Sequence, residues 1–549
     1  MSDELQGEAF PTLTEGEIEI VREHAHERAV HAGEILFEQG EPTTKLFVVL
    51  DGELEIVSPR RLATEPVAIY RRGGFTGEMT ILSGGHALAQ CRARTAALVL
   101  EIDRRRLREV VAGHTTLGDK VMRAFILRHI RLVATGSDAV ILVGSRHSPD
   151  TLRVQQFLTR NSHPHQTIDV ESDPAAQETL DQFNIAISDV PVVISRGRNV
   201  LKNPTNEQLA DCLGYNPVLD EAHVRDVVVV GAGPGGLAAA IYGGSEGLDV
   251  LVLESTAPGG QAGSSSKIEN YLGFPMGISG QELAERAYTQ AEKFGTEIAI
   301  ARTAARLECE RRPYKVVMAN GQTVLARTIV IATGARYRKP AIESLPRFEG
   351  VGIYYSATAV EARLCGNEEV IVVGGANSAG QAAVYLAQTA RKVHMLVRGK
   401  ALSDTMSRYL IRRIEESAVI ELMVETEIVE LEGEGDLARV TWLHKRTGER
   451  VTRPIGHVFM MTGAAPNTEW LERCVAIDDK GFVKAGTDLT QEDLTTAAWP
   501  LTRSPFLFET SLPGVFAVGD VRANSVKRVA SAVGEGSICI QLVHKVLSE

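Results

Sequence analysis

The spacing of apolar and polar positions changes along the chain and predicts three segments of different structure. In the first, residues 11–130, short runs such as 33–37 and 45–50 alternate apolar and polar side chains between turns. This alternation is typical of half-buried strands, so we expect a β-rich domain closed by helices. The second segment, from 138 to about 213, alternates short apolar runs with helical stretches, which indicates a small α/β domain.

The third segment contains two strand–glycine–helix units. In the first unit, the apolar run 226–230 leads directly into a glycine-rich turn at 231–236 and then into a helical stretch. A dinucleotide pyrophosphate binds at a helix N-terminus in this context. We expect Gly231 to allow the tight turn, Gly233 to let the pyrophosphate approach the backbone, and Gly236 to let the helix pack closely.

The second strand of each unit ends beside a charged side chain that predicts which ribose is recognised. In the first unit this side chain is Glu254, 23 positions after Gly231, which is suited to bind the adenosine ribose hydroxyls. In the second unit, residues 370–397, the strand is followed by Arg398 and Lys400. These cations could pair with a 2′-phosphate, so NADPH is preferred and NADH remains possible.

Further motifs resemble those of the low-molecular-weight thioredoxin reductase family, and the resemblance covers residues 226–549. The motifs are Pro258-Gly259-Gly260-Gln261, Ile268-Glu269-Asn270-Tyr271, Ala332-Thr333-Gly334, Gly514-Val515-Phe516-Ala517-Val518-Gly519-Asp520 and Lys527-Arg528-Val529-Ala530. The resemblance implies an α/β reductase fold with two dinucleotide-binding domains. Its FAD-binding domain would comprise 226–337 and 465–549, its NAD(P)H-binding domain 338–464, and the protein would be a homodimer.

The resemblance also implies roles for single residues. Gln261 and Asn270 would approach the isoalloxazine ring, the Gly519 backbone would face the phosphates, and Asp520 would bind the ribityl chain. Taken together, the expected cofactor-binding residues are Gly231, Gly233, Pro234, Gly236, Glu254, Gly260, Gln261, Asn270, Ala332, Gly334, Gly374, Gly375, Asn377, Ser378, Ala379, Arg398, Lys400, Gly519, Asp520, Arg528 and Val529.

The sequence departs from this family where the family carries its redox-active Cys-Ala-Thr-Cys-Asp run. Alignment on Ala357-Thr358 places Ser356 and Ala359 at the two cysteines and Val360 at the acid. A serine hydroxyl cannot replace a thiolate in disulfide exchange, so a conventional dithiol mechanism is excluded and no catalytic residue is assigned. Cys365 stands alone, and a substitute disulfide would need a distant partner.

The middle segment, 138–215, resembles glutaredoxin-like and thioredoxin-like domains that have lost their CxxC motif. Ser145 and Ser148 stand at the two cysteine positions, and Val190-Pro191 resembles the cis-proline of that fold. The groove could still bind a peptide or a glutathione-like ligand. Arg146 and His147 are interpreted as exposed polar residues on the first turn of a helix rather than as catalytic groups. A linker at 216–225 follows.

Residues 1–135 resemble a cyclic-nucleotide-binding domain, a β-roll. Gly33-Glu34, Gly40-Glu41, Asp51-Gly52-Glu53 and Phe75-Thr76-Gly77-Glu78 occur in the expected order. The arginine that neutralises the cyclic phosphate in that family falls on Ala87 here, next to His86, although Arg92 and Arg94 follow. A docking or dimerisation module is therefore favoured, and cyclic-nucleotide binding stays open.

Composition narrows the class of protein further. The 70 acidic and 58 basic side chains give a net charge of −12, which argues against general nucleic-acid binding. Six dispersed cysteines predict neither a disulfide framework nor a metal site. The acidic start has no apolar signal region, and the apolar stretch 227–242 is interrupted by glycines, so we expect no membrane insertion and a cytoplasmic location.

Two functions remain open at this stage. The first is an oxidoreductase in which NAD(P)H reduces FAD and the flavin passes electrons directly to a small molecule or a small protein. The second is a sensor or scaffold in which the redox or nucleotide state changes the arrangement of the domains. Repeated turnover with an acceptor would distinguish the enzyme from the sensor.

Overall fold

The structure, a computed structural model, describes residues 8–549 with short gaps. The gaps are residues 43, 58–65, 67, 78–80, 82–86, 88, 135–139, 174–175, 177–179, 182–184, 187–188, 196–198, 266–267, 269, 350, 356, 358–361, 363–364, 403–405 and 463. Ser356, Ala359 and Val360, on which the predicted loss of the dithiol depends, therefore lie outside the described residues, as do Glu78 and His86.

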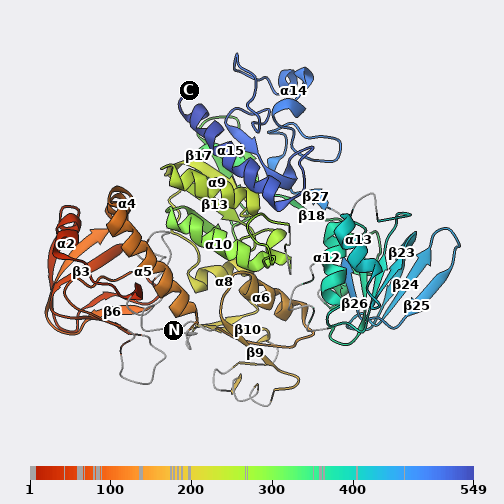
Figure 1. Cartoon of the computed structure of the whole chain (residues 1–549), viewed down its shortest axis with the longest axis horizontal. Helices are drawn as coiled ribbons and strands as arrows, with labels where there is room; N and C mark the ends of the chain where they lie inside the picture. The colour runs from red at the N-terminus through yellow and green to blue at the C-terminus, as the bar shows by residue number, and fades with distance from the viewer. Residues whose placement is uncertain are drawn as a thin grey trace.

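The N-terminal domain contains two small sheets that share one apolar core (red to orange in Figure 1). The strand orders are β1-β7-β3 and β2-β6-β4-β5. The strands are β1 (His26–Val30), β2 (Ile35–Phe37), β3 (Lys45–Asp51), β4 (Leu54–Val57), β5 (Ala68–Tyr70), β6 (Gln90–Ala93) and β7 (Ala97–Asp103), and the helices are α2 (Glu15–Arg22), α4 (Arg104–Gly113) and α5 (Thr115–Ala134). The alternating apolar pattern thus forms the predicted β-rich domain closed by helices.

The middle domain has a four-stranded sheet in the order β11-β10-β8-β9. Its elements are β8 (Val140–Gly144), α6 (Pro149–Arg160), β9 (His165–Asp169), β10 (Val192–Ser195), β11 (Asn199–Lys202) and α8 (Asn206–Leu213). The peptide bond before Pro191 is cis, as the resemblance implied. Arg146 and His147 are exposed as expected, but they lie in the turn before α6 because Pro149 is the first helical residue.

The core domain is built on a seven-stranded sheet in the order β14-β13-β12-β17-β16-β15, with β28 paired to β17. Its strands are β12 (Val224–Val230), β13 (Val250–Glu254), β14 (Glu297–Ile300), β15 (Ala304–Glu308), β16 (Tyr314–Met318), β17 (Thr323–Ile331) and β28 (Val515–Ala517), with helices α9 (Pro234–Ser245), α10 (Gly280–Lys293), α14 (Gln491–Thr496) and α15 (Val529–Leu547). The uninterrupted valines of β12 are buried on both faces, which is typical of parallel strands covered by helices.

The inserted domain leaves the core domain after β17 and returns before α14. It has a five-stranded sheet, β19-β26-β20-β21-β22, and a three-stranded sheet, β23-β24-β25. The elements are β19 (Ile353–Tyr354), β20 (Glu369–Val373), α12 (Asn377–Leu386), β21 (Lys392–Leu396), α13 (Arg408–Glu415), β22 (Ile420–Met423), β23 (Thr426–Glu432), β24 (Arg439–His444), β25 (Arg450–Arg453) and β26 (His457–Met460). Outgoing and returning chains pair as β18 (Ala335–Tyr337) and β27 (Ala464–Pro466).

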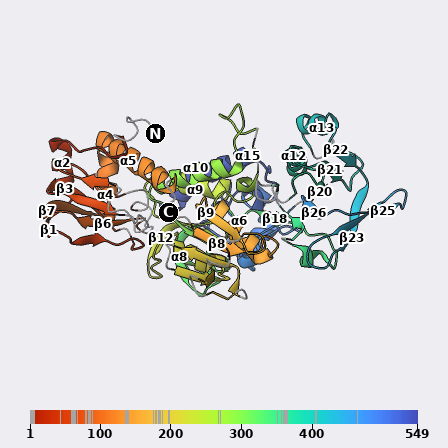
Figure 2. The same cartoon turned by 90° about the horizontal axis from the view of Figure 1, so that it is seen from below.

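The N-terminal and inserted domains lie on opposite sides of the core domain in both views (Figure 1 and Figure 2). The N-terminal domain contacts the core domain through α4, where Arg104 Nη2 lies 2.7 Å from Glu297 Oε1 and Arg108 Nη2 donates to the carbonyl oxygen of Gly295 at 2.6 Å. The middle domain instead shares a continuous apolar cluster with the core domain. Among the helices in the described part of the chain, none combines the length and apolar character needed to cross a bilayer.

One expectation about the cysteines is wrong. Cys309, which follows β15, forms a disulfide with Cys474, although no disulfide was predicted. The two residues are 165 positions apart, and the whole inserted domain separates them in sequence. Sequence spacing could not reveal this pair because the two segments meet only when the core domain closes.

Candidate functional site

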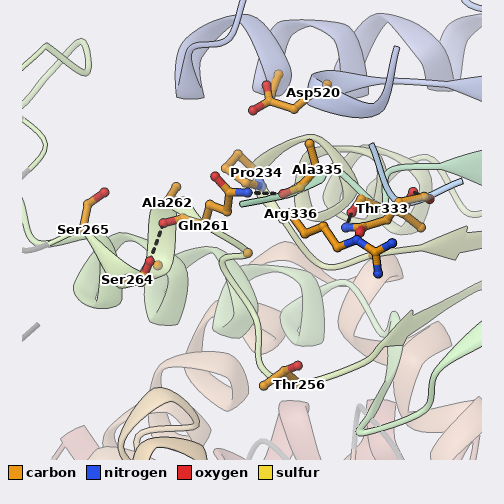
Figure 3. A pocket seen from close by; sticks show the side chains of 18 of the residues that line it. Pro234, Thr256, Gln261, Ala262, Ser264, Ser265, Thr333, Ala335, Arg336 and Asp520 are labelled. Carbon is orange, nitrogen blue, oxygen red and sulfur yellow. Dashed lines mark hydrogen bonds between the residues drawn. The ribbon is translucent and has the colours of Figure 1, made fainter. Parts of the chain in front are cut away.

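A cavity of about 1220 Å³ that is open to solvent is lined by parts of the core, middle and inserted domains. Its wall includes the turns after β12 and β13, the N-terminal turn of α12 and the start of α15; Figure 3 shows part of this wall. Sites for one small molecule typically have volumes of about 300–1,000 Å³. This cavity is therefore large enough for a dinucleotide and a second ligand that meets it.

At Gly231 and Gly236, in and after the turn between β12 and α9, there is no space for a side chain. A Cβ atom on Gly231 would lie 2.4 Å from the carbonyl oxygen of Ala332, and one on Gly236 would lie 1.8 Å from the carbonyl oxygen of Gly231. Gly231 also has a φ of 105°, which favours glycine. Gly233 is the N-cap of α9 and Pro234 its first residue, so unpaired backbone N–H groups of the helix are available at the cavity. This turn fits a pyrophosphate group.

Glu254 is buried at the end of β13 and lines the cavity. One carboxylate oxygen accepts a hydrogen bond from the Ala232 N–H at 2.8 Å, and the other accepts from the N–H groups of Thr256 and Ala257 at 2.8 and 3.2 Å. These bonds connect the phosphate turn to the following loop. Ser255 Oγ also donates to Glu254 Oε1, at 3.4 Å, so a ribose hydroxyl would replace this bond, the longest of the four.

The loop after β13 carries the residues expected at the flavin ring. The Gln261 side chain donates from Nε2 to the carbonyl oxygen of Ala335, an interaction drawn in Figure 3. Asn270 lines the same cavity and is exposed. Nearby, Thr333 and Asn467 exchange two hydrogen bonds, from Thr333 Oγ1 to Asn467 O at 2.8 Å and from Asn467 Nδ2 to Thr333 O at 2.9 Å. This pair ties the first half of the core domain to its returning half.

The C-terminal part of the site is the turn at Gly519 and Asp520. The Gly519 N–H donates to Glu535 Oε2 at 2.7 Å, so this N–H is already paired within the protein. Burial raises the pKa of the Asp520 carboxyl; Lys527 opposes this effect and Glu535 adds to it. Asp520 lines the cavity and points toward the loops of the first half (Figure 3). Its carboxyl is placed to receive a hydroxyl donor.

The inserted domain contributes a second glycine turn, between β20 and α12. Gly374 has a φ of 146°, and a Cβ atom there would lie 2.2 Å from the carbonyl oxygen of Met461. Asn377 and Ser378, at the start of α12, line the cavity. The side chain of Ala379 is instead fully buried in the core of the inserted domain, so only its backbone could contact a ligand.

The cavity brings together most of the residues predicted from the sequence. Those that line it are Gly231, Gly233, Pro234, Glu254, Gly260, Gln261, Asn270, Ala332, Gly334, Asn377, Ser378, Gly519, Asp520, Arg528 and Val529. Those that do not are Gly236, Gly374, Gly375, Ala379, Arg398 and Lys400. Arg398 and Lys400 are exposed just beyond β21. Their role in binding a 2′-phosphate stays a prediction.

Sequence reasoning missed several residues of this cavity. Arg160, at the end of α6, reaches it from the middle domain. Lys339, Glu349 and Tyr355 form a chain near the inserted domain, with Lys339 Nζ 2.6 Å from Glu349 Oε1 and Tyr355 Oη donating to the same carboxylate at 2.5 Å. Burial and the Glu349 charge raise the pKa of Tyr355. No motif marks these residues, because they are adjacent only in the folded chain.

The cysteines of the described chain lie away from the cavity wall. Cys309 and Cys474 pack against the apolar cluster under β15, and neither lines the cavity. Cys365 is buried in the core of the inserted domain. Burial also raises the pKa of Cys91 to about 12. None of these positions resembles a thiol exposed beside a redox cofactor.

The arginines considered for a nucleotide phosphate in the N-terminal domain already have partners. Arg92 Nε lies 2.6 Å from Glu55 Oε1, and Arg94 Nη1 lies 3.4 Å from Glu53 Oε2. Ala87 is buried and exchanges backbone hydrogen bonds with the turn at 40–41. A phosphate would have to compete with Glu53 and Glu55 for these cations.

Comparison with known families matches two parts of the chain. The model of the pyridine nucleotide-disulphide oxidoreductase family matches residues 225–536, and that of the cyclic nucleotide-binding domain matches residues 27–114. Among curated proteins, the thioredoxin reductase of Listeria monocytogenes is 31% identical over 330 residues, which are 60% of this chain and 96% of that protein. The thioredoxin reductase of Bacillus subtilis is 30% identical over 332 residues, or 60% of this chain and 97% of that protein.

Solved structures give the same result for the C-terminal part. Thioredoxin reductase from Lactococcus lactis aligns with a TM-score of 0.52 and 27% identity over 59% of this chain and 99% of its own. The enzyme from T. acidophilum aligns with a TM-score of 0.53 and 24% identity over 59% of this chain and 99% of its own, a likeness of fold alone. The matching region contains the core and inserted domains, and therefore most of the cavity.

Proposed function

Because the chain belongs to the thioredoxin reductase family of pyridine nucleotide-disulphide oxidoreductases, we propose that its flavin passes electrons from NADPH directly to an acceptor, without a paired-cysteine relay. FAD and NADPH are the cofactors of this family. The observation that carries the proposal is that Asn377 and Ser378 of the inserted domain line the same cavity as the flavin-side loops of the core domain. The two cofactors can therefore meet without an intermediate group.

Different residues of the cavity would bind different parts of FAD and NADPH. When bound, FAD accepts two electrons as hydride and releases them to a second substrate. The turn at Gly231 and Gly233 would hold its pyrophosphate, Glu254 its adenosine ribose and Asp520 its ribityl chain, while Gln261 would border the ring. Arg398 and Lys400 would recognise the 2′-phosphate of NADPH.

Two observations support an acceptor that meets the flavin directly. Ser356 and Ala359 stand in the sequence where the family carries its cysteines. Neither Cys309 nor Cys474 lines the cavity. The acceptor we propose is a small molecule such as a quinone, or a small electron-carrier protein.

The test is anaerobic stopped-flow absorbance of the FAD-loaded protein. NADPH should bleach the flavin within one rapid phase, and a quinone or a ferredoxin should restore the oxidised spectrum, whereas thioredoxin with a disulfide substrate should not. The double variant Cys309→Ser, Cys474→Ser should behave like the wild type. Turnover with thioredoxin that is lost in the double variant would instead identify this disulfide as a relay.

A second function, regulation by a bound nucleotide, is favoured by the N-terminal domain. Its residues 27–114 match the cyclic nucleotide-binding family, and α4 contacts the core domain through Arg104 and Arg108. We propose that occupancy of this domain changes the rate of flavin turnover. Titration with cyclic AMP or cyclic GMP should change the rate of quinone reduction, and an unchanged rate at millimolar nucleotide would leave a docking module as the better interpretation.

We also propose that the middle domain has a thioredoxin-like fold without redox activity. The support is its sheet order, β11-β10-β8-β9, and the position of Ser145 and Ser148 in the turn after β8. Ser145 Oγ donates to Glu171, so this turn is closed by a local hydrogen bond. Mass spectrometry after oxidation with a disulfide such as oxidised glutathione should find no mixed disulfide on this domain except at Cys212.

A homodimer is the proposed assembly. Helices α9 and α15 of the core domain pack against each other and carry the exposed apolar side chains Tyr242 and Ile538, which are 45% and 46% accessible. Apolar side chains of this size on adjoining helices favour burial against a partner. Light scattering should give the mass of two chains, and Ile538→Arg should shift it toward one.

A further inference from the structure

The middle domain forms part of the cavity wall at its phosphate end. The side chains of Gln156 and Arg160, one helical turn apart on α6, and of Thr159 line the cavity together with the turn at 231–233. The family match begins at residue 225, so none of these residues belongs to the part of the chain that matches known reductases. A segment outside the reductase fold therefore contributes to its cofactor cavity.

Arg160 is held in this position by the loop that follows β13. Its Nη2 atom donates to the carbonyl oxygen of Gly260 at 3.0 Å. Gly260 in turn lies against the phosphate turn, because a Cβ atom on Gly260 would lie 3.1 Å from the Cα atom of Gly233. Gly260 therefore lies between the guanidinium group of Arg160 and the N-terminus of α9.

The end of α6 is fixed around Arg160. Asn161 Nδ2 donates to Thr256 O at 3.2 Å, and Gln281 Nε2, from α10, donates to Thr159 O at 2.7 Å. Behind these bonds, the apolar cores of the middle and core domains are continuous. Arg160 thus belongs to a rigid wall, and its position does not depend on a flexible loop.

In the part of the chain that the structure describes, the charge of Arg160 has no acidic counter-ion. No carboxylate of the described residues lies within ion-pair distance of its guanidinium group. The N-terminus of α9, which lies on the same cavity wall, is also positive. Glu254 lines the same cavity but forms its hydrogen bonds with the backbone N–H groups of 232, 256 and 257 and with Ser255 Oγ, and not with Arg160. Two positive groups on the same cavity wall repel each other, and an anion bound between them offsets this repulsion.

We propose that Arg160 pairs with the pyrophosphate of FAD, so that the middle domain serves to retain the flavin. The inference rests on the proposed function, because it requires the core domain to bind FAD. A charged hydrogen bond of this kind strengthens binding by roughly tenfold or more. The pairing gives this domain, which lacks the CxxC motif, a role that does not require redox chemistry.

The experiment measures the affinity of full-length apo-protein for FAD by fluorescence titration. Arg160→Met should raise the dissociation constant by roughly tenfold or more, and Arg160→Lys by less, because lysine keeps the charge. Arg146→Met is the matched control, since Arg146 is an exposed arginine of the same domain that does not line the cavity and contacts Asp169 at 3.5 Å and His147 Nε2 at 3.1 Å. The dissociation constant of Arg146→Met for FAD should equal that of the wild type.

The dependence of FAD affinity on salt concentration distinguishes an ion pair between Arg160 and the phosphates from an indirect effect in which the loop at Gly260 loses its hydrogen bond to Arg160. In the wild type, FAD affinity should fall as salt rises, and this dependence should be weaker in Arg160→Met. Equal affinity of Arg160→Met and wild type, or a weaker affinity with unchanged salt dependence, would overturn the inference. A wild-type protein that binds no FAD would instead overturn the proposed function.

Discussion

Glycines at the two dinucleotide turns show how single residues limit this site. At Gly236 the backbone of Gly231 approaches so closely that a methyl group would lie 1.8 Å from its carbonyl oxygen. Gly374 combines a close neighbour with a φ of 146°. These positions could be recognised from the sequence because only glycine satisfies both the conformation and the space.

Gly236→Ala is expected to abolish stable FAD binding and leave NADPH binding intact, because the inserted domain has its own core. The change would force apart the turn that holds the pyrophosphate. Flavin absorbance of the purified protein and NADPH titration of the apo-protein measure the two effects. Gly534→Ala is the control, since a Cβ atom there meets nothing within 4 Å; a yellow Gly236→Ala protein would contradict this account.

The single residue Asp520 predicts that the stability of the apo-protein depends on pH. Burial raises its pKa above the ordinary value of 3.8, so the folded apo-protein holds this proton more tightly than the unfolded chain does. The free energy of unfolding therefore falls as pH rises from about 3.8 through the raised pKa, and the loss is complete above it. Asp520→Asn should remove this decrease, so the apo-variant should melt higher than apo-wild type at neutral pH. Equal melting temperatures at pH 7 would contradict the raised pKa.

At the scale of elements, helix α4 and strand β14 connect the N-terminal domain to the core domain. Glu297 forms ion pairs with Arg104 of α4 and with Arg225 of β12, each with an N–O distance of 2.7 Å. Arg225 is buried and also pairs with Asp249 at 2.8 Å. Removing Glu297 would leave two cations short of a partner, whereas removing Arg104 would leave none of the buried charges unpaired.

Glu297→Gln is therefore expected to destabilise the core domain by about 3 kcal/mol, and Arg104→Ala by less than about 1 kcal/mol. Urea denaturation followed by flavin fluorescence measures both. Limited proteolysis should show that each change exposes the junction between the N-terminal and core domains. Equal effects of the two variants on the urea midpoint would show that the ion pair between Arg225 and Glu297 does not stabilise the core domain.

At the scale of the whole molecule, the Cys309–Cys474 disulfide closes a loop that contains the entire inserted domain. It joins β15 in the first half of the core domain to the segment that follows the return of the chain. Closing a loop of this length restricts the unfolded chain and should stabilise the core domain by about 3–5 kcal/mol.

Reduction of this disulfide should therefore lower the temperature at which the core domain unfolds. The double variant Cys309→Ser, Cys474→Ser should melt at the temperature of the reduced wild type, with or without dithiothreitol. Calorimetry with and without the reductant measures this. A wild-type melting temperature that does not respond to reductant would mean that the pair does not stabilise the core domain.

The sequence by itself determined the family and the β-rich N-terminal domain, and most of the cofactor-binding residues that it predicted line the cavity. Glycine turns, strand ends and loop motifs are local signals, because the dinucleotide contacts them through backbone positions close together in sequence. The seven-stranded sheet was predictable in kind because buried parallel strands are continuously apolar.

Only the tertiary structure decided which distant groups meet. Cys309 and Cys474 form a disulfide, Arg160 reaches the phosphate turn from another domain, and Glu297 joins Arg104 to Arg225. None of these contacts has a local pattern, because each depends on how separately folded domains pack. Packing of domains is determined by the shape and charge of whole surfaces, which one-dimensional spacing does not contain.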